Sequence, residues 1–167
     1  QVGGWAVEVL RGCHRNRVVA CELHDLGGGG VKIGHEGGLP REWVDGSAGA
    51  FIGMDAVGLG WGPCREDAGG LLPGRDRPEA SATTVSDCSI HDGGLIFHSA
   101  IGVWIGDASR NRVLYNHIWN LFNSGISSGW TWNYRPAFSC GNRIEGNRIH
   151  TIGRGVLSDV GGIYLLS

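Results

Sequence analysis

A single acid, Asp159, stands between glycine-rich turns in the segment GVLSDVGGIY, four residues before Ile163. An acid placed between Val and Gly residues ahead of a strand is expected to lose part of its hydration, which raises the pKa of a carboxyl group. A raised pKa suits a general acid catalyst. The alternative is an Asp that forms the turn by accepting hydrogen bonds from backbone N–H groups.

A second group combines an acid with aromatic residues. Asp107 in WIGDAS and the aromatic residues Trp130, Trp132 and Tyr134 in SGWTWNY each follow a short strand-like block bounded by glycines. Indole faces pack against the C–H faces of sugar rings, while neighbouring polar groups bind the hydroxyls. This group is therefore a candidate sugar platform. The alternative is that the indoles pack a loop against the body of the protein.

A third group is a column of polar residues at equivalent places in an internal repeat: Asp25, Asp92, Asn120 and Thr151, with His98 nearby. If the copies stack at the ~4.8 Å spacing of paired strands, members of the column lie about 5 Å or about 10 Å apart. These separations bracket the distances between the paired carboxylates of retaining and inverting glycosidases. The alternative is turn chemistry at a corner of the fold.

The repeat that positions these groups runs through the chain in four copies. Each copy has an aliphatic anchor, at Val18, Val85, Val113 and Ile144. A second aliphatic residue follows five positions later, at Leu23, Ile90, Ile118 and Ile149. Each copy ends in a block that starts with Gly, at 30–34, 102–106, 125–129 and 162–166. Between the two aliphatic positions lies a column of small or amide residues: Cys21, Cys88, Asn116 and Asn147.

The spacing of the repeat predicts the fold. Period-two alternation of β-branched residues indicates short strands, and units this short bury a hydrophobic face only by stacking on one another. We predict an all-β, right-handed parallel β-helix of about four coils, formed by residues 1–34 and 83–167. Residues 35–82 break the pattern and are expected to form an inserted loop. Because the chain starts without Met and ends in an apolar strand, it is interpreted as a fragment of a larger domain.

Composition supports this architecture and excludes other classes. Gly accounts for 31 of 167 residues, well above the usual ~7%, which disfavours helices and favours tight turns. The net charge of −2 and the scattered Arg residues give no nucleic-acid footprint. No apolar run approaches the ~20 residues of a membrane span. The five cysteines contain no C-x-x-C pair, so neither a zinc site nor a cofactor is expected, and the cysteines are interpreted as small buried side chains.

The segments HSAIGVWIG, SGISSGWTW and GVLSDVGGIY, together with HDLGGGGVKIG (24–34), resemble the right-handed β-helix proteins near glycoside hydrolase family 141. The resemblance covers about 120 residues and implies a secreted bacterial enzyme that acts on fucose- or xylose-containing plant glycans. It also implies a site of paired carboxylates that includes Asp159. Relatives carry an acid where this chain has Asn120, and an amide cannot transfer the catalytic proton.

The leading hypothesis is therefore a secreted, periplasmic or surface glycoside hydrolase that binds an oligo- or polysaccharide as a monomer. Asp159 would be the general acid or the nucleophile, with Asp92 or Asp107 as its partner. His98 would tune the site, and Trp130, Trp132, Tyr134 and Asn120 would bind the sugar. A glycan-binding or structural β-helix without activity is the alternative, favoured by Asn120. A polysaccharide lyase is a third, weaker reading, since it would use clustered acids around Ca²⁺.

Overall fold

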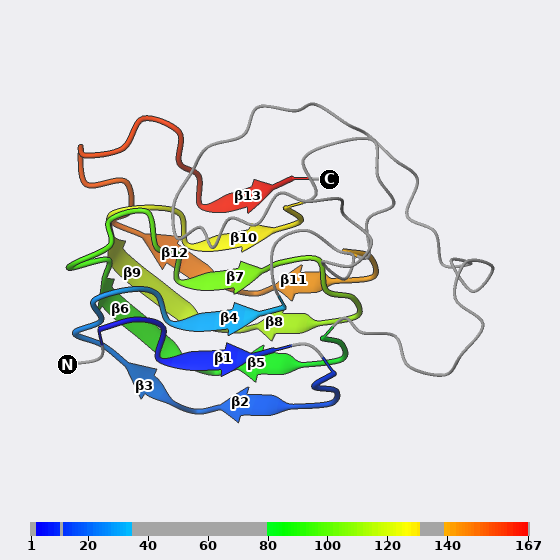
Figure 1. Cartoon of the computed structure of the whole chain (residues 1–167). Coiled ribbons are helices and arrows are strands. Elements are labelled where there is room, and N and C mark those ends of the chain that lie inside the picture. Colours follow the sequence, from blue (N-terminus) through cyan, green and yellow to red (C-terminus); the bar gives the residue numbers. More distant parts are fainter. Residues whose placement is uncertain (1–2, 11, 35–79, 131–138, 167) are drawn as a thin grey trace.

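The computed structural model describes residues 3–10, 12–34, 80–130 and 139–166. In these ranges the chain forms thirteen short strands and no helix, and hence no helix that could cross a bilayer. The strands form three parallel sheets that wind around a common interior, so that the chain is a parallel β-helix (Figure 1). The predicted fold class is confirmed.

Each sheet takes one strand from every coil. Sheet 1 contains β1 (Val7–Val9), β4 (Val31–Ile33), β7 (Val103–Ile105), β10 (Ile126–Ser128) and β13 (Ile163–Leu165). Sheet 2 contains β2 (Arg17–Val19), β5 (Thr84–Ser86), β8 (Arg112–Leu114) and β11 (Arg143–Glu145). Sheet 3 contains β3 (Glu22–Leu23), β6 (Ser89–Gly93), β9 (His117–Leu121) and β12 (Arg148–His150). A coil therefore runs from sheet 2 through sheet 3 to sheet 1.

The register of the sheets reproduces the alignment of the sequence repeat. Val18, Val85, Val113 and Ile144 are direct neighbours in sheet 2, and Leu23, Ile90, Ile118 and Ile149 are direct neighbours in sheet 3. Val85, Val113, Ile90 and Ile118 are fully buried. Inward aliphatic columns of this kind supply most of the stabilisation, since a fully buried Val or Ile contributes about 1.5–3 kcal/mol.

Three corners per coil use left-handed backbone. Residues of one corner column, Ala20, Asp87, Tyr115 and Gly146, have φ between 54° and 65°. The same conformation recurs in the column Arg15, Ala82, Arg110 and Gly141 and in the column Asp25, Asp92, Asn120 and Thr151. A single left-handed residue turns the chain sharply between two short strands, and Gly, Asn and Asp tolerate it best. This geometry explains the abundance of these residues at the corners.

Packing requires three of the four glycines that open the sheet 1 blocks, Gly30, Gly102 and Gly125. A Cβ atom on Gly102 would lie 2.8 Å from Cγ2 of Ile118, and one on Gly125 would lie 2.5 Å from Cγ2 of Ile149. Both distances are shorter than real contacts allow. The inward Ile column of sheet 3 therefore occupies the space that a side chain would need.

The amides of the column of small or amide residues form a hydrogen-bonded ladder between coils. Asn116 Oδ1 accepts a hydrogen bond from the backbone N–H of Cys88 (3.0 Å), and Asn147 Oδ1 accepts one from the N–H of Asn116 (2.9 Å). The side-chain NH₂ groups donate to the same neighbouring coil, from Asn116 to the Val85 carbonyl and from Asn147 to the Val113 carbonyl. Each amide thus binds the neighbouring coil at both of its ends.

The predicted boundary of the insertion needs one correction. Residues 80–82, assigned to the inserted loop, belong to the coil: Ala80 is fully buried, and Ser81 forms parallel bridges with His14 and Ser109. The pattern of aliphatic anchors starts only at residue 83, so it could not detect these small residues. The rest of the predicted insertion, residues 35–79, lies outside the described residues.

We predict that Asn116→Ala lowers the free energy of unfolding by about 3 kcal/mol. The substitution leaves the Cys88 N–H and the Val85 carbonyl without their partners, and each such buried group costs about 1–3 kcal/mol. Urea denaturation measures the change. Arg112→Ala, at an exposed position of the neighbouring β8, is the matched control and should stay within about 0.5 kcal/mol of wild type. Equal losses in the two variants would contradict the ladder's role.

Candidate functional site

The predicted site residues divide between the two ends of the sheet 1 strands. Asp92, His98, Asn120 and Asp159 lie on the corner where the chain passes from sheet 3 to sheet 1. Asp107 lies beyond the opposite end of β7, in the turn that leaves sheet 1, and it is 3% exposed. Its predicted role as a partner of Asp159 is therefore not supported by its position. Asp92 is the predicted partner on the same corner.

Trp130 and Asp159 each bind an outward residue of sheet 1. Ser127 and Tyr164 are register partners on β10 and β13, at positions between the inward residues of each strand. The Trp130 Nε1–H donates to Ser127 Oγ (2.9 Å), and the Tyr164 hydroxyl donates to Asp159 Oδ2 (2.8 Å). Trp130 follows β10 whereas Asp159 precedes β13, so the two side chains start from opposite ends of neighbouring strands and are linked to the same face through Ser127 and Tyr164.

We call this group the outer face of sheet 1; it comprises Trp104, Ser127, Trp130, Asp159 and Tyr164. Trp104 is the register partner of Ser127 on β7, and its ring lies 5.7 Å from the ring of Trp130 at an interplanar angle of 54°. Trp104 is buried, whereas Trp130 and Tyr164 are partly exposed and Asp159 is exposed. The group therefore combines buried and partly exposed aromatic rings with an accessible carboxylate.

The surroundings of Asp159 differ from those expected from the sequence in two respects. The predicted loss of hydration around this carboxyl group is wrong, because the side chain lies at the surface. Its link to Tyr164 was not predicted. The hydrogen bond to Asp159, with a further contribution from burial, raises the pKa of the Tyr164 phenol. The phenol therefore stays protonated and remains a hydrogen-bond donor to Asp159.

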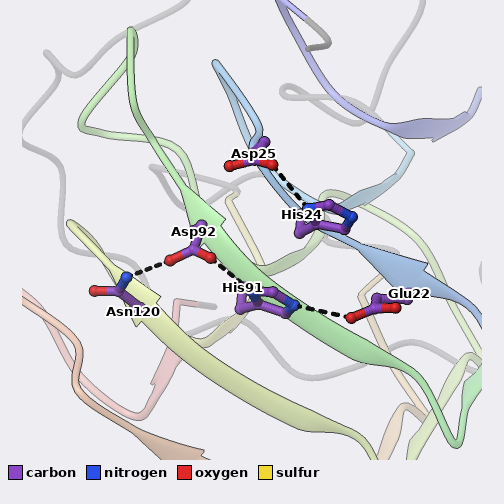
Figure 2. Close-up of polar contacts among 6 residues, drawn as sticks. All are labelled: Glu22, His24, Asp25, His91, Asp92 and Asn120. Atoms are coloured by element: carbon purple, nitrogen blue, oxygen red, sulfur yellow. Dashed lines mark hydrogen bonds and ion pairs between the residues drawn. The ribbon is translucent and has the colours of Figure 1, made fainter.

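A second group, the corner network, joins sheet 3 to the corner (Figure 2). His91 Nδ1 lies 2.7 Å from Asp92 Oδ2, and His91 Nε2 lies 3.4 Å from Glu22 Oε1. The Asn120 amide donates to Asp92 Oδ1 from the next coil. One coil earlier, His24 Nδ1 lies 2.9 Å from Asp25 Oδ2, so the same His–Asp pair recurs.

The corner network keeps Asp92 ionised. The hydrogen bond from His91, then the one from Asn120, lower the pKa of the Asp92 carboxyl group below its usual value. An ionised carboxylate suits a base or a nucleophile and not a general acid. Asn120 thus has a definite partner: its amide binds the carboxylate of the preceding coil.

The outward side of sheet 3 carries a ring ladder that sequence reasoning did not select as a site. His24 stacks on His91 with 5.4 Å between centroids, His91 on Trp119 with 4.0 Å, and Trp119 on His150 with 6.1 Å. These residues occupy the same column of the repeat, so their alignment was visible in the sequence. His91 lies inside the ladder, with a ring on each of its faces and both ring nitrogens paired with carboxylates, so it offers no free face to a sugar ring.

A hydrogen bond between two imidazoles extends the ladder. His117 Nε2 lies 2.8 Å from His150 Nε2, so one ring donates and the other accepts. Burial, and then the charges of Arg148, His150 and His91, lower the pKa of His117. The described residues contain no group of three His, Cys, Asp or Glu side chains placed to hold a metal ion.

The remaining predicted site residues are His98, Thr151, Trp132 and Tyr134. His98 is exposed and stacks on Phe122, with 4.3 Å between centroids, while the Arg154 guanidinium lies 4.6 Å from the same ring. Its predicted tuning role stays a prediction. Thr151 is an exposed corner residue whose hydroxyl pairs with His150. Trp132 and Tyr134 lie outside the described residues.

Most of the chain matches a known protein family. The family described as "Right handed beta helix region" matches residues 72–165, which is more than half of the sequence. The chain belongs to this family. The predicted handedness of the β-helix is thereby confirmed.

A solved structure named "Glycoside hydrolase" is similar in three dimensions, with a TM-score of 0.68 and 21% sequence identity. The alignment covers 98% of this chain and 23% of that protein, so this chain spans about a quarter of the length of the protein it matches. Likeness at this identity shows the fold alone. No curated protein matches the sequence at a significant level.

The histidine pair predicts a loss of stability in mild acid. Because the pKa of His117 is lower in the folded chain than in the unfolded chain, stability is complete above the unfolded value of about 6.5 and falls as the pH drops below it. Thermal melts between pH 7 and pH 5 measure the slope. His117→Gln should flatten it, whereas His14→Gln, outside the ladder, should keep it. An unchanged slope in His117→Gln would contradict the assignment.

The corner network predicts that Asn120→Ala raises the pKa of Asp92. The substitution removes one of the two hydrogen bonds that favour the carboxylate, so the stability that Asp92 supplies above its unfolded pKa becomes smaller, and its loss on acidification is complete at a higher pH. A ¹³C NMR titration of the carboxyl group measures the shift. Tyr115→Phe, at a different corner, should leave the titration unchanged, and an unshifted Asp92 in Asn120→Ala refutes the prediction.

Proposed function

We propose that this chain is part of a carbohydrate-active β-helix protein, a glycoside hydrolase, that binds a glycan along the outer face of sheet 1. The observation that carries the proposal is the pair of hydrogen bonds through Ser127 and Tyr164. These bonds bring the Trp130 indole and the Asp159 carboxylate to neighbouring strands of one face.

The chemistry of this face fits a sugar. A partly exposed indole offers an apolar surface for the C–H side of a pyranose, and the hydroxyl and carboxylate beside it bind hydroxyl groups. The Trp104 ring beneath Trp130 restricts the rotation of the upper indole. A platform that is rigid before binding loses less conformational freedom when a ligand is bound.

Glycoside hydrolysis by paired carboxylates needs one group that donates a proton and one that acts as base or nucleophile. Asp92 suits the second role because its pKa is lowered by His91 and Asn120. We assign the first role to Asp159 because the resemblance includes it in the carboxylate pair and because it is accessible to solvent. Asp159 stands in the loop 151–162 that joins β12 to β13, and Asp92 stands where β6 leads into the equivalent loop two coils earlier.

The finer assignment rests on the resemblance to glycoside hydrolase family 141. It proposes fucose- or xylose-containing plant glycans as substrates and a secreted or surface location. The structural neighbour named "Glycoside hydrolase" supports the general class through its fold.

The test compares the hydrolysis of aryl fucosides, aryl xylosides and plant oligosaccharides by the protein that carries this chain and by its variants. Asp159→Asn and Asp92→Asn should each lower kcat/KM by about 10²-fold or more, the scale of general acid–base catalysis. Asp87→Asn, an exposed acid on another corner, is the matched control and should retain activity. Trp130→Ala should raise KM more than it lowers kcat. Full activity in Asp159→Asn refutes the assignment.

A glycan-binding β-helix without hydrolysis is the second candidate. It is favoured by the engagement of both Asp92 oxygens, one with His91 and one with Asn120, in a network that also fixes the corner. Binding measured by calorimetry with no turnover in wild type or Asp159→Asn would establish this candidate in place of the enzyme.

A further inference from the structure

Two cysteines far apart in the sequence occupy the same place in successive coils. Glu22 and Leu23 of β3 pair with Ser89 and Ile90 of β6, so Cys21 and Cys88, one residue earlier, are also in register. The backbone N–H of Ser89 donates to the Cys21 carbonyl (2.9 Å), which continues the parallel pairing through this position. Neighbouring residues of paired strands have Cα atoms about 4.8 Å apart. This spacing lies within the 4.4–6.8 Å range of disulfides.

Both thiols point the same way. Each sulfur lies near the carbonyl two residues earlier in its own coil: Cys21 Sγ lies 3.4 Å from the Val19 oxygen, and Cys88 Sγ lies 3.1 Å from the Ser86 oxygen. Val19 and Ser86 are themselves register partners, so the two side chains are stacked in parallel. Cys88 Sγ also lies 3.5 Å from the Val18 oxygen of the preceding coil, which shows that it reaches toward Cys21.

The amide ladder ends where the cysteines begin. Asn147 binds the N–H of residue 116, and Asn116 binds the N–H of residue 88, so each amide ties its coil to the one before. At position 88 the side chain is a thiol, and sulfur is only a weak acceptor. The tie between the first and second coils is therefore weakened in this column, at the pair of coils that the insertion 35–79 separates in sequence.

We propose that Cys21 and Cys88 form a disulfide that joins the first coil to the second in an oxidising environment. The bond takes over, covalently, the position that Asn116 and Asn147 hold between the later coils. Burial, and the nearby Cys21, raise the pKa of Cys88, which makes the partly exposed Cys21 the thiol that an oxidant meets first.

The disulfide forms by a two-step thiol–disulfide exchange with a small-molecule disulfide such as oxidised glutathione. The Cys21 thiolate attacks the glutathione disulfide, which forms a mixed disulfide and releases one reduced glutathione. Cys88 loses its proton and attacks the Cys21 sulfur, which forms the Cys21–Cys88 bond and releases the second reduced glutathione. The two protein thiols are oxidised by two electrons, and one glutathione disulfide is reduced to two thiols.

The expected geometry makes this disulfide responsive to reductants. Cβ atoms on paired strands must approach by about 1 Å to reach the mean Cβ separation of about 3.8 Å in disulfides. Strain of this kind raises the reduction potential and makes the bond easier to reduce. The bond would close a loop of 67 residues, and cross-links of long loops stabilise the folded state most in the chain-entropy account.

The test uses the full chain with Cys13, Cys64 and Cys140 changed to Ser, so that only Cys21 and Cys88 remain. The folded protein is incubated with oxidised glutathione, quenched in acid, unfolded, alkylated and mapped by mass spectrometry. We expect loss of both alkylation sites, a peptide linked through residues 21 and 88, and a Tm raised by about 10 °C that mild reductant reverses. A control that adds Cys88→Ser should show no such rise.

The proposal is overturned if both thiols remain free to alkylate under conditions that fully glutathionylate the exposed Cys13 of the wild-type chain. It is also overturned if glutathione stays on Cys21 without transfer to Cys88. Cys21→Ser keeps the test decisive if Cys88→Ser folds poorly, because Cys21 is the less buried of the pair.

Discussion

The structure depends on the hydrogen-bonded register between coils, and the inner amide columns fix that register. A parallel strand pair could slip, because its backbone bonds are equivalent at every step of two residues. Asn116 prevents a slip by binding the N–H of one neighbouring coil and the amide of the other in the same geometry. Asn111 and Asn142 repeat this arrangement at the next corner. Left-handed residues at all three corners repeat the same backbone turn in successive coils.

Fixed register is also what brings the candidate site together. Ser127 and Tyr164 are far apart along the chain but adjacent in sheet 1, and each recruits a functional side chain through one hydrogen bond. The same principle joins Asp92 to Asn120 and aligns the rings of His91 and Trp119. The inward positions are occupied by aliphatic columns, so variation in outward positions can change chemistry without disturbing the fold.

Much of the fold could be read from the repeat. The anchors, the second aliphatic column and the glycine blocks align in the structure as they do in the sequence. The limits of the sequence reasoning appear at single residues. Ala80 and Ser81 join the coil with no aliphatic signal, and the surface position of Asp159 could not be deduced from its apolar neighbours. His91 and Trp119 occupy one column of the sequence repeat, but the stacking of their rings could not be deduced from that column.

The sequence by itself determined the architecture, because a repeated pattern of alternating aliphatic residues, amides and glycines is satisfied only when units stack in register. Only the tertiary structure decided which polar residues meet. Asp92 and Asn120 stand in one column of the repeat, yet the hydrogen bond between them and the pairing of Asp92 with His91 appear only in the structure. The reason is physical: a repeat fixes where each Cα lies along the coil, whereas a side chain's partner depends on its rotamer and on the neighbouring coils.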